Sequence, residues 1–283
     1  MAFHQLIPDV AGLGLVIDNL APWLGLGLPL LLILAIGSGG RGTFITLLVP
    51  ALVWGVLFGP AALPAKAVDS PEALHVATQN VHQDAVQSAQ TLADSGADVI
   101  TLQELGSGQI EQVTKALKKS HPHFYSVSTV GVWSKYPLSN PQPLDLGLGW
   151  NRALRIDIAT TAGSVRFYSV HAASARPMAH GERDTMLEAL GSYLANDGSA
   201  RIIAAGDFNA SNTDRHFAPV ARQLDQVPYT GWGLPMTWPR TPFPMLSIDN
   251  VLIRGAGEAS MERIAAGDSD HYALRASVLL AGD

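Results

Sequence analysis

Two long stretches without charged residues near the N-terminus place the strongest constraint on how this chain can fold. No Asp, Glu, Lys or Arg lies between Asp18 and Arg41, or between Arg41 and Lys66. Each interval is about as long as a bilayer-crossing helix, which needs roughly 20 residues. We therefore predict a membrane hairpin with two spans, at about residues 19–40 and 43–63, within an N-terminal region of residues 1–68.

Two other interpretations of this region remain open. The stretches could be buried helices of a soluble domain, although Pro29 and Pro50 are more easily tolerated in membrane helices. Alternatively, Arg41, the apolar run after it and the stretch 65–67 resemble the charged start, core and cleavage site of a signal peptide.

The orientation of the hairpin rests on one residue. Arg41 is the only Lys or Arg before Lys66, and basic residues favour the cytoplasmic side. A connector inside the cell leaves both ends outside. We therefore expect a multi-pass membrane protein whose second region, residues 69–283, is an extracytoplasmic catalytic domain.

The charge balance of residues 69–283 bears on the substrate. The four charged residues of the first 68 cancel, so the net charge of −6 belongs to the second region. Proteins that bind nucleic-acid backbones non-specifically usually present a basic face. The acidic balance disfavours such a substrate without removing it. The absence of cysteine excludes disulfides, thiolate nucleophiles and cysteine-based zinc sites.

Residues 69–283 alternate between short β-rich runs and amphipathic helical patterns. The predicted strands are 74–79, 98–102, 153–158, 165–170, 201–205, 248–253 and 273–280. The predicted helices are 84–95, 110–119 and 183–194. This order predicts a mixed α/β (α+β) domain in which two sheets pack together with helices outside.

Polar residues fall within these strands or directly after them. They are Asn80, Glu104, His171, Asp207, Asn209, Asp249, Asp270 and His271. Carboxylates and amides at such positions are suitable ligands for a hard cation such as Mg²⁺ or Mn²⁺. Histidines add groups that titrate near neutral pH. Each residue alone has an ordinary explanation as a turn residue, a cap or a solvated strand end. The prediction of a functional site therefore depends on all of them occurring together in one domain.

The order of the motifs resembles the endonuclease/exonuclease/phosphatase (DNase I-like) superfamily. The matching stretches span nearly all of residues 75–279. They are Gln79-Asn80, Asp98 to Glu104, Gly131 to Leu138, Tyr168 to His171, Gly206-Asp207-Phe208-Asn209, Ile248 to Leu252 and Ser269-Asp270-His271. The resemblance implies a four-layer α/β/β/α sandwich. It also implies a cation site made of Glu104, Asn80 and Asp270.

The resemblance further implies catalytic roles. Asp207 would orient or deprotonate the attacking water, and Asn209 would position water and phosphate. His271 would contact the phosphoryl oxygens, with its ring held by Asp249. His171 would be a second histidine at the phosphate, which only some branches of the superfamily have.

Some features depart from the superfamily or stay undecided. Val127 stands roughly where some nucleases have a tyrosine, and we assign no substrate role to Arg152, Arg155 or Arg176. The loop from Pro228 to Met245, rich in Pro, Gly and aromatic residues, is either a lid over an apolar substrate or a packed surface loop.

The function predicted from the sequence is a membrane-anchored, Mg²⁺-dependent phosphoesterase that hydrolyses a phosphodiester or phosphomonoester. A lipid headgroup or small phosphodiester is the preferred substrate, and no protein partner is implied. The alternatives are an extracytoplasmic nuclease acting on DNA or RNA, and a binding scaffold without catalysis.

Overall fold

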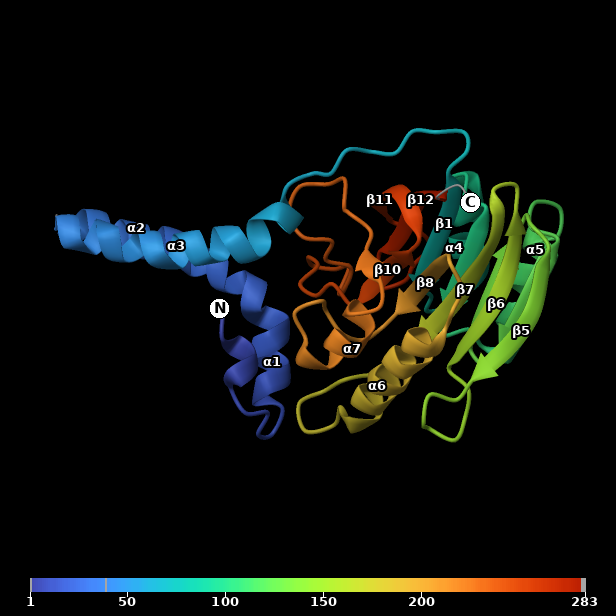
Figure 1. Ribbon diagram of the computed structural model, residues 1–283, viewed down its shortest axis with the longest axis horizontal. Helices are drawn as coiled ribbons and strands as arrows, with labels where there is room; N and C mark the ends of the chain where they lie inside the picture. Colours follow the sequence, from blue (N-terminus) through green and yellow to red (C-terminus); the bar gives the residue numbers. More distant parts are fainter. Residues whose placement is uncertain (1, 39, 281–283) are drawn as a thin grey trace.

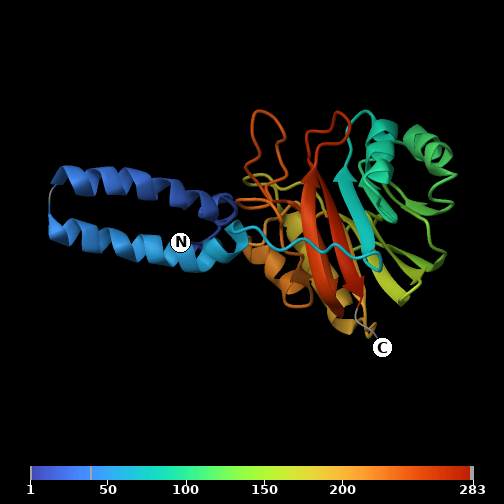
Figure 2. The ribbon, with the colours of Figure 1, turned by 90° about the horizontal axis from the view of Figure 1, so that it is seen from above.

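The computed structural model describes residues 2–38 and 40–280, and it consists of a folded domain and a helical hairpin that projects from it. Figure 2 shows the two hairpin helices side by side, pointing away from the domain. Gly39 of the predicted connector lies outside the described residues.

The first sheet contains six strands in the order β11-β12-β1-β2-β4-β3. Their bounds are β1 Leu74–Asn80, β2 Val99–Gln103, β3 His123–Val127, β4 Val130–Ser134, β11 Ala256–Ile264 and β12 Ala273–Leu280. Strands β1 and β2 are parallel, and all other neighbours are antiparallel.

The second sheet also has six strands, in the order β5-β6-β7-β8-β10-β9. Their bounds are β5 Leu138–Leu144, β6 Ala153–Thr160, β7 Gly163–His171, β8 Ile202–Asp207, β9 Asp225–Gln226 and β10 Asp249–Arg254. Only β7 and β8 run parallel.

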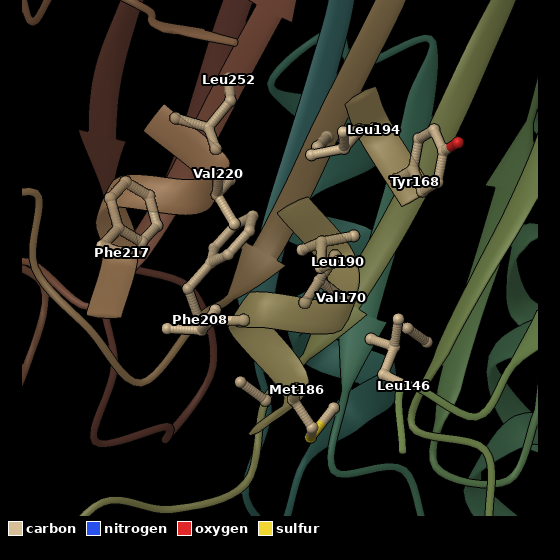
Figure 3. Packing of buried hydrophobic residues seen from close by; sticks show 14 of the residues in the cluster. Leu146, Tyr168, Val170, Met186, Leu190, Leu194, Phe208, Phe217, Val220 and Leu252 are labelled. Carbon is tan, nitrogen blue, oxygen red and sulfur yellow. The ribbon is translucent and has the colours of Figure 1, made fainter. Parts of the chain in front are cut away.

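Three hydrophobic cores join the two sheets and their helices into four layers. The helices of the domain are α4 Ala85–Asp94, α5 Ser107–Leu117, α6 Gly181–Asn196 and α7 Ala218–Ala221, with a 3₁₀ turn η3 at Arg215–Phe217. One core lies between the sheets and a second lies under α4 and α5. The third packs α6, η3 and α7 against the second sheet, where Leu190, Phe208 and Phe217 meet (Figure 3). Because helices cover the outer faces, central strands such as β2 and β8 are buried throughout. The predicted four-layer sandwich is confirmed.

The N-terminal region is divided between the domain and the hairpin. Its elements are η1 His4–Leu6, α1 Leu13–Leu20, η2 Ala21–Leu26, α2 Gly27–Ser38 and α3 Arg41–Ala62. Helices α2 and α3 form the hairpin, and most of their large apolar side chains are exposed. Two helical stretches, Leu13–Ser38 and Gly42–Ala62, are long and apolar enough to cross a membrane, with only 17% and 6% of their most apolar windows buried. Such exposure differs from that of helices in a soluble core. By length and composition alone, however, a signal sequence would pass the same test.

The first predicted span differs from the structure at its start. Residues 18–20 belong to α1, which packs against the domain, and the projecting helix begins at Gly27. Asp18 explains the difference, because its buried carboxylate accepts hydrogen bonds from the guanidinium of Arg215, at 2.6 and 3.1 Å. Asn19 adds a bond from its Nδ2 to Asp214 Oδ2, at 2.9 Å. Residues 2–20, here called the N-terminal segment, therefore form part of the folded domain.

All predicted strands and helices of residues 69–283 are present, but further strands appear. Strands β3, β5 and β11 lie at sheet edges. Strand β5 contains Pro141 and Pro143, and β11 contains Gly257 and two glutamates. Edge strands tolerate such residues, so their sequences lack the alternation that predicts a strand.

Candidate active site

The topology brings the predicted site residues to one edge of both sheets. Asn80 ends β1, and Glu104 directly follows its parallel neighbour β2. In the other sheet, His171 ends β7 and is level with Asp207 at the end of the parallel strand β8. The carboxyl ends of parallel strands meet at one edge of a sheet, which explains how residues far apart in sequence converge.

Antiparallel neighbours complete this edge from the other direction. Asp249 starts β10 and pairs with Asp207. His271 and Asp270 directly precede β12, the antiparallel partner of β1. A strand that runs the opposite way begins where its neighbour ends. All eight predicted residues are therefore brought to the same end of the sandwich.

The two sheets are joined at the site by the amide of Asn80. Its Nδ2 donates to Glu104 Oε1 at 3.0 Å and to Asp207 Oδ2 at 2.9 Å. With the amino group turned to these carboxylates, the amide oxygen points away from both. Asn80 is thus positioned to offer an oxygen ligand while its nitrogen fixes the two acids.

Glu104 is held as a carboxylate. Its Oε1 lies 3.5 Å from His171 Nε2, and its side chain is 45% exposed. The hydrogen bond from His171, opposed by burial and aided by the bond from Asn80, lowers the pKa of Glu104 to about 2. At neutral pH this side chain therefore presents a negative oxygen to its surroundings.

Asp207 is buried and tightly constrained. Its Oδ1 accepts from the backbone N–H of Asn209 at 2.8 Å. Asn209 itself adopts a left-handed conformation with φ of 48°, and its Nδ2 donates to Ala172 O at 3.0 Å. Burial, with the nearby charge of Asp249, raises the pKa of Asp207 to about 6. This carboxyl group can therefore accept a proton near neutral pH.

His271 forms a buried pair with Asp249. The distance from His271 Nδ1 to Asp249 Oδ2 is 2.8 Å. Burial favours the neutral ring, but the charge and hydrogen bond of Asp249, with smaller contributions from Asp207 and Asp270, raise the pKa of His271 to about 10. The ring is therefore an imidazolium at neutral pH, with Nε2 turned away from Asp249.

Ser269 explains the local fold of the Ser-Asp-His motif. Its Oγ donates to Asn80 O at 2.6 Å and accepts from His271 N at 3.0 Å. Gln79 Nε2 adds a bond to His271 O at 3.2 Å. The motif is thereby fastened to the end of β1, which fixes His271 relative to Asn80.

Two groups of side chains could accept a cation. Asp207, Asp249 and His271 have ligand atoms within 4.8 Å of one another. In this group His271 Nδ1 faces Asp249 Oδ2 and both oxygens of Asp207 accept hydrogen bonds, whereas Asp249 Oδ1 is buried without a hydrogen-bond partner among the described residues. Glu104, Asn80 and Asp270 instead line a common cavity, and each carries a side-chain oxygen. An all-oxygen set suits a hard divalent cation, so the residues present fit such an ion.

The cavity has a volume of about 450 Å³ and contains all the predicted residues except His171 and Asp249 in its lining. One wall comes from α1, through Leu15, Val16 and Leu20. Trp238 and Leu246, from the loop between β9 and β10, form another. The polar end of the cavity is therefore joined to an apolar one.

Sequence reasoning missed three contributions to the site. Arg152 Nη2 lies 3.0 and 2.8 Å from the two ring nitrogens of His171, and its Nε donates to His171 O at 3.2 Å. Trp238 Nε1 donates to Asp270 Oδ2 at 2.9 Å. The third is α1. Arg152 carried no distinguishing pattern, whereas Trp238 belongs to the aromatic-rich loop from Pro228 to Met245, for which the sequence leaves a lid as one interpretation.

Hydrolysis of a phosphate ester needs positive charge beside the phosphoryl oxygens and a base beside the attacking water. On this two-sheet sandwich, the imidazolium of His271, the carboxyl group of Asp207 and the all-oxygen set are groups with the charges that such a reaction requires. The sequence agrees, because residues 77–271 match the profile of the Endonuclease/Exonuclease/phosphatase family. The chain belongs to this family, and it is a hydrolase of phosphate esters.

Solved structures show the same fold at low sequence identity. A variant of beta toxin from Staphylococcus aureus with bound magnesium ions is 14% identical, with a TM-score of 0.58 over 72% of this chain and 99% of that one. Sphingomyelinase C from Streptomyces griseocarneus is 17% identical, with a TM-score of 0.57 over 74% and 99%. A humanized TDP2 of D. rerio is 18% identical, with a TM-score of 0.57 over 73% and 99%. None of the curated proteins matches this chain.

Proposed function

We propose that this chain is a membrane-anchored, Mg²⁺-dependent phosphodiesterase whose substrate is a lipid headgroup or another small phosphodiester with an apolar portion. One observation carries the choice of substrate. Helix α1 lines the catalytic cavity with Leu15, Val16 and Leu20, and the same stretch continues through η2 into the apolar helix α2. A substrate in the bilayer surface would therefore meet the apolar wall and the polar site together.

The proposed chemistry divides between the two ends of the polar site. Glu104, Asn80 and Asp270 would hold Mg²⁺, which supplies positive charge to the phosphoryl oxygens. Asp207 accepts a proton from the attacking water, and Asn209 positions that water. The Nε2–H of His271 donates to a phosphoryl oxygen as negative charge develops there.

Two further residues position these groups. Asp249 keeps His271 charged and fixes its ring through Nδ1. His171 lies between Arg152 and Glu104, outside the lining of the cavity, so its role as a second donor to the phosphate stays a prediction. Similarity to a structure named Sphingomyelinase C and to a magnesium-bound beta toxin supports both the metal and the substrate class.

The proposal is tested with the full chain in lipid nanodiscs, with and without Mg²⁺. Three substrates are compared: a phosphodiester lipid in the bilayer, a soluble aryl phosphodiester, and plasmid DNA. We expect the lipid to be hydrolysed most efficiently. His271→Ala and Glu104→Ala should each lower the rate by on the order of 10²–10³-fold. His123→Ala and Glu111→Ala, which change the same residue types outside the cavity, should have little effect.

The outcomes separate the alternatives. Preferential cleavage of plasmid DNA that requires His271 would establish the nuclease instead. Activity that survives both cavity substitutions would show that the site is wrong. A folded protein without activity on any of the three substrates would support the binding scaffold.

A further inference from the structure

A second group of potential metal ligands lies outside the catalytic cavity, where the N-terminal segment meets the domain. Asp9 comes from the turn before α1, His180 caps the start of α6, and His216 lies in η3. One ligand atom from each lies within 4.8 Å of the others. Their side chains are 15%, 17% and 38% exposed.

One carboxylate oxygen of Asp9 accepts hydrogen bonds from α1, and the other accepts none among the described residues. Its Oδ1 accepts from the backbone N–H groups of Gly14 at 2.9 Å and Leu15 at 3.2 Å, at the start of the helix. Its Oδ2 is buried without a hydrogen-bond partner among the described residues. Its nearest charge-pairing group is the ring of His180. This oxygen lies 3.3 Å from His180 Nε2.

The ring of His180 is fixed by a third residue. His180 Nδ1 lies 2.7 Å from Asp184 Oδ2, one turn along α6, and Asp184 is held in turn by Arg183 Nε at 2.7 Å. A carboxylate can only accept, so Nδ1 carries a proton. In the neutral ring, Nε2 then presents its lone pair to Asp9 Oδ2. A carboxylate behind a histidine is the usual arrangement around metal-ligating imidazoles.

A positive charge between these facing lone pairs would stabilise them, and either a proton on His180 Nε2 or a metal ion can supply it. His216 Nε2 also lies 3.4 Å from Asp184 Oδ2. A proton would bridge only two atoms, whereas the ring of His216 also adjoins the pair, with its centroid 6.2 Å from that of His180. Three ligands from three separate segments suit a metal ion better. Two imidazole nitrogens and one carboxylate oxygen are typical ligands of Zn²⁺, which leaves a fourth position for water.

We propose that Asp9, His180 and His216 form a second metal site that takes a Zn²⁺-like transition-metal ion and fastens the N-terminal segment to the catalytic domain. This site differs from the catalytic one in its ligands, because Glu104, Asn80 and Asp270 offer only oxygen. Through Asp9, the ion is coupled to α1, the helix that lines the catalytic cavity. Its occupancy therefore helps to hold that wall in place.

The test measures Zn²⁺ binding to the full chain in nanodiscs by equilibrium dialysis and elemental analysis. Mg²⁺ is present in excess, and Glu104→Gln is used as the background so that the catalytic cation site does not contribute. We expect one Zn²⁺ per chain. Asp9→Asn and His180→Gln should each weaken binding by at least roughly 10–100-fold, the range for residues that only support a metal ligand, because both are direct ligands in the proposal.

Asp9→Asn is the sharpest variant because asparagine can still cap α1 through Oδ1. His123→Gln is the matched control, since this histidine lies on β3. Hydrogen exchange provides a second measurement. Zn²⁺ should slow exchange of residues 13–20 in the Glu104→Gln protein but not when Asp9→Asn is added.

Absence of Zn²⁺ binding, or binding of the same strength after Asp9→Asn and His180→Gln in folded protein, would overturn the proposal. Binding that also disappears in His123→Gln would likewise overturn it, because the loss would then not follow the ligands. Since the measurement is made without catalysis, its result is independent of the substrate assigned to the catalytic site.

Discussion

Each catalytic group depends on a neighbour that sets its protonation, and Asp249 acts on two groups at once. Its charge raises the pKa of His271 to about 10 and contributes to raising the pKa of Asp207 to about 6. The proposed mechanism needs His271 charged and Asp207 ionised. Activity should therefore rise with pH through about 6 and fall through about 10.

Asp249→Asn should move both the rise and the fall of activity with pH toward lower pH. Removal of the negative charge makes His271 easier to deprotonate and Asp207 easier to ionise. The maximal rate should also drop by on the order of 10²–10³-fold. The measurement is kcat/KM against pH with a soluble aryl phosphodiester. A profile with unchanged limbs would show that Asp249 does not control these groups.

The glycine of the Gly-Asp-Phe-Asn motif has a steric role beside the site. Gly206 has φ of 147°, and a Cβ built there would lie 1.9 Å from Val170 O on the adjacent strand. Gly206→Ala must therefore separate β8 from β7 or strain the backbone. We expect a loss of about 3 kcal/mol in unfolding free energy, measured by chemical denaturation of the full chain in detergent. Gly198→Ala, whose Cβ would meet open space, is the control and should have little effect.

At the scale of the elements, helix α1 is the part of the site that can be changed without touching the chemistry. Val16 lines the cavity, whereas Leu13 lies on the same helix outside its lining, and both side chains are partly exposed. Val16→Ser should raise KM for the lipid substrate several-fold, because part of the apolar contact is lost. The KM for the soluble aryl phosphodiester should stay unchanged. Leu13→Ser should alter neither, and an equal effect of both substitutions would contradict a role in substrate selection.

The central elements of the fold could be predicted from the sequence because local patterns determine them. The apolar runs of β2 and β8 are buried on both faces. In each sheet the polar residues at the strand ends converge because β2 runs parallel to β1 and β8 runs parallel to β7. The role of α1 could not be predicted in this way. Its docking depends on Asp18 and Asn19 meeting Arg215 and Asp214, contacts between residues nearly 200 positions apart that leave no periodic signal.

At the scale of the whole molecule, the hairpin and the α1 wall of the catalytic cavity belong to one continuous N-terminal stretch. Helix α3 has 22 residues and a length of about 33 Å, close to the thickness of a hydrocarbon core. Helix α2 has 12 residues and reaches only about 18 Å. The 3₁₀ helix η2 must therefore add to its length if this first arm of the hairpin is to cross the hydrocarbon core. Trp23 and Trp54 lie at this junction, where Trp54 Nε1 donates to Pro22 O at 2.8 Å and Trp23 Nε1 donates to Met245 O at 2.7 Å.

Trp23 at the foot of the apolar hairpin favours a position at the membrane surface, since the indole ring prefers the headgroup region. Trp54 lies about 12 Å from the end of α3, within the hydrocarbon region if the whole helix crosses. Trp232, which is 79% exposed, lines a surface pocket at the base of the hairpin together with Trp23 and Trp54. In vesicles of brominated lipid, the fluorescence of the full chain should therefore be partly quenched. Trp232→Phe and Trp54→Phe should each lower the fraction of the fluorescence that brominated lipid quenches. Trp150→Phe, in the loop between β5 and β6, should remove fluorescence that the lipid does not quench. Equal fluorescence in brominated and ordinary lipid would place the hairpin outside the bilayer, and the apolar wall of α1 would then have to serve a soluble substrate.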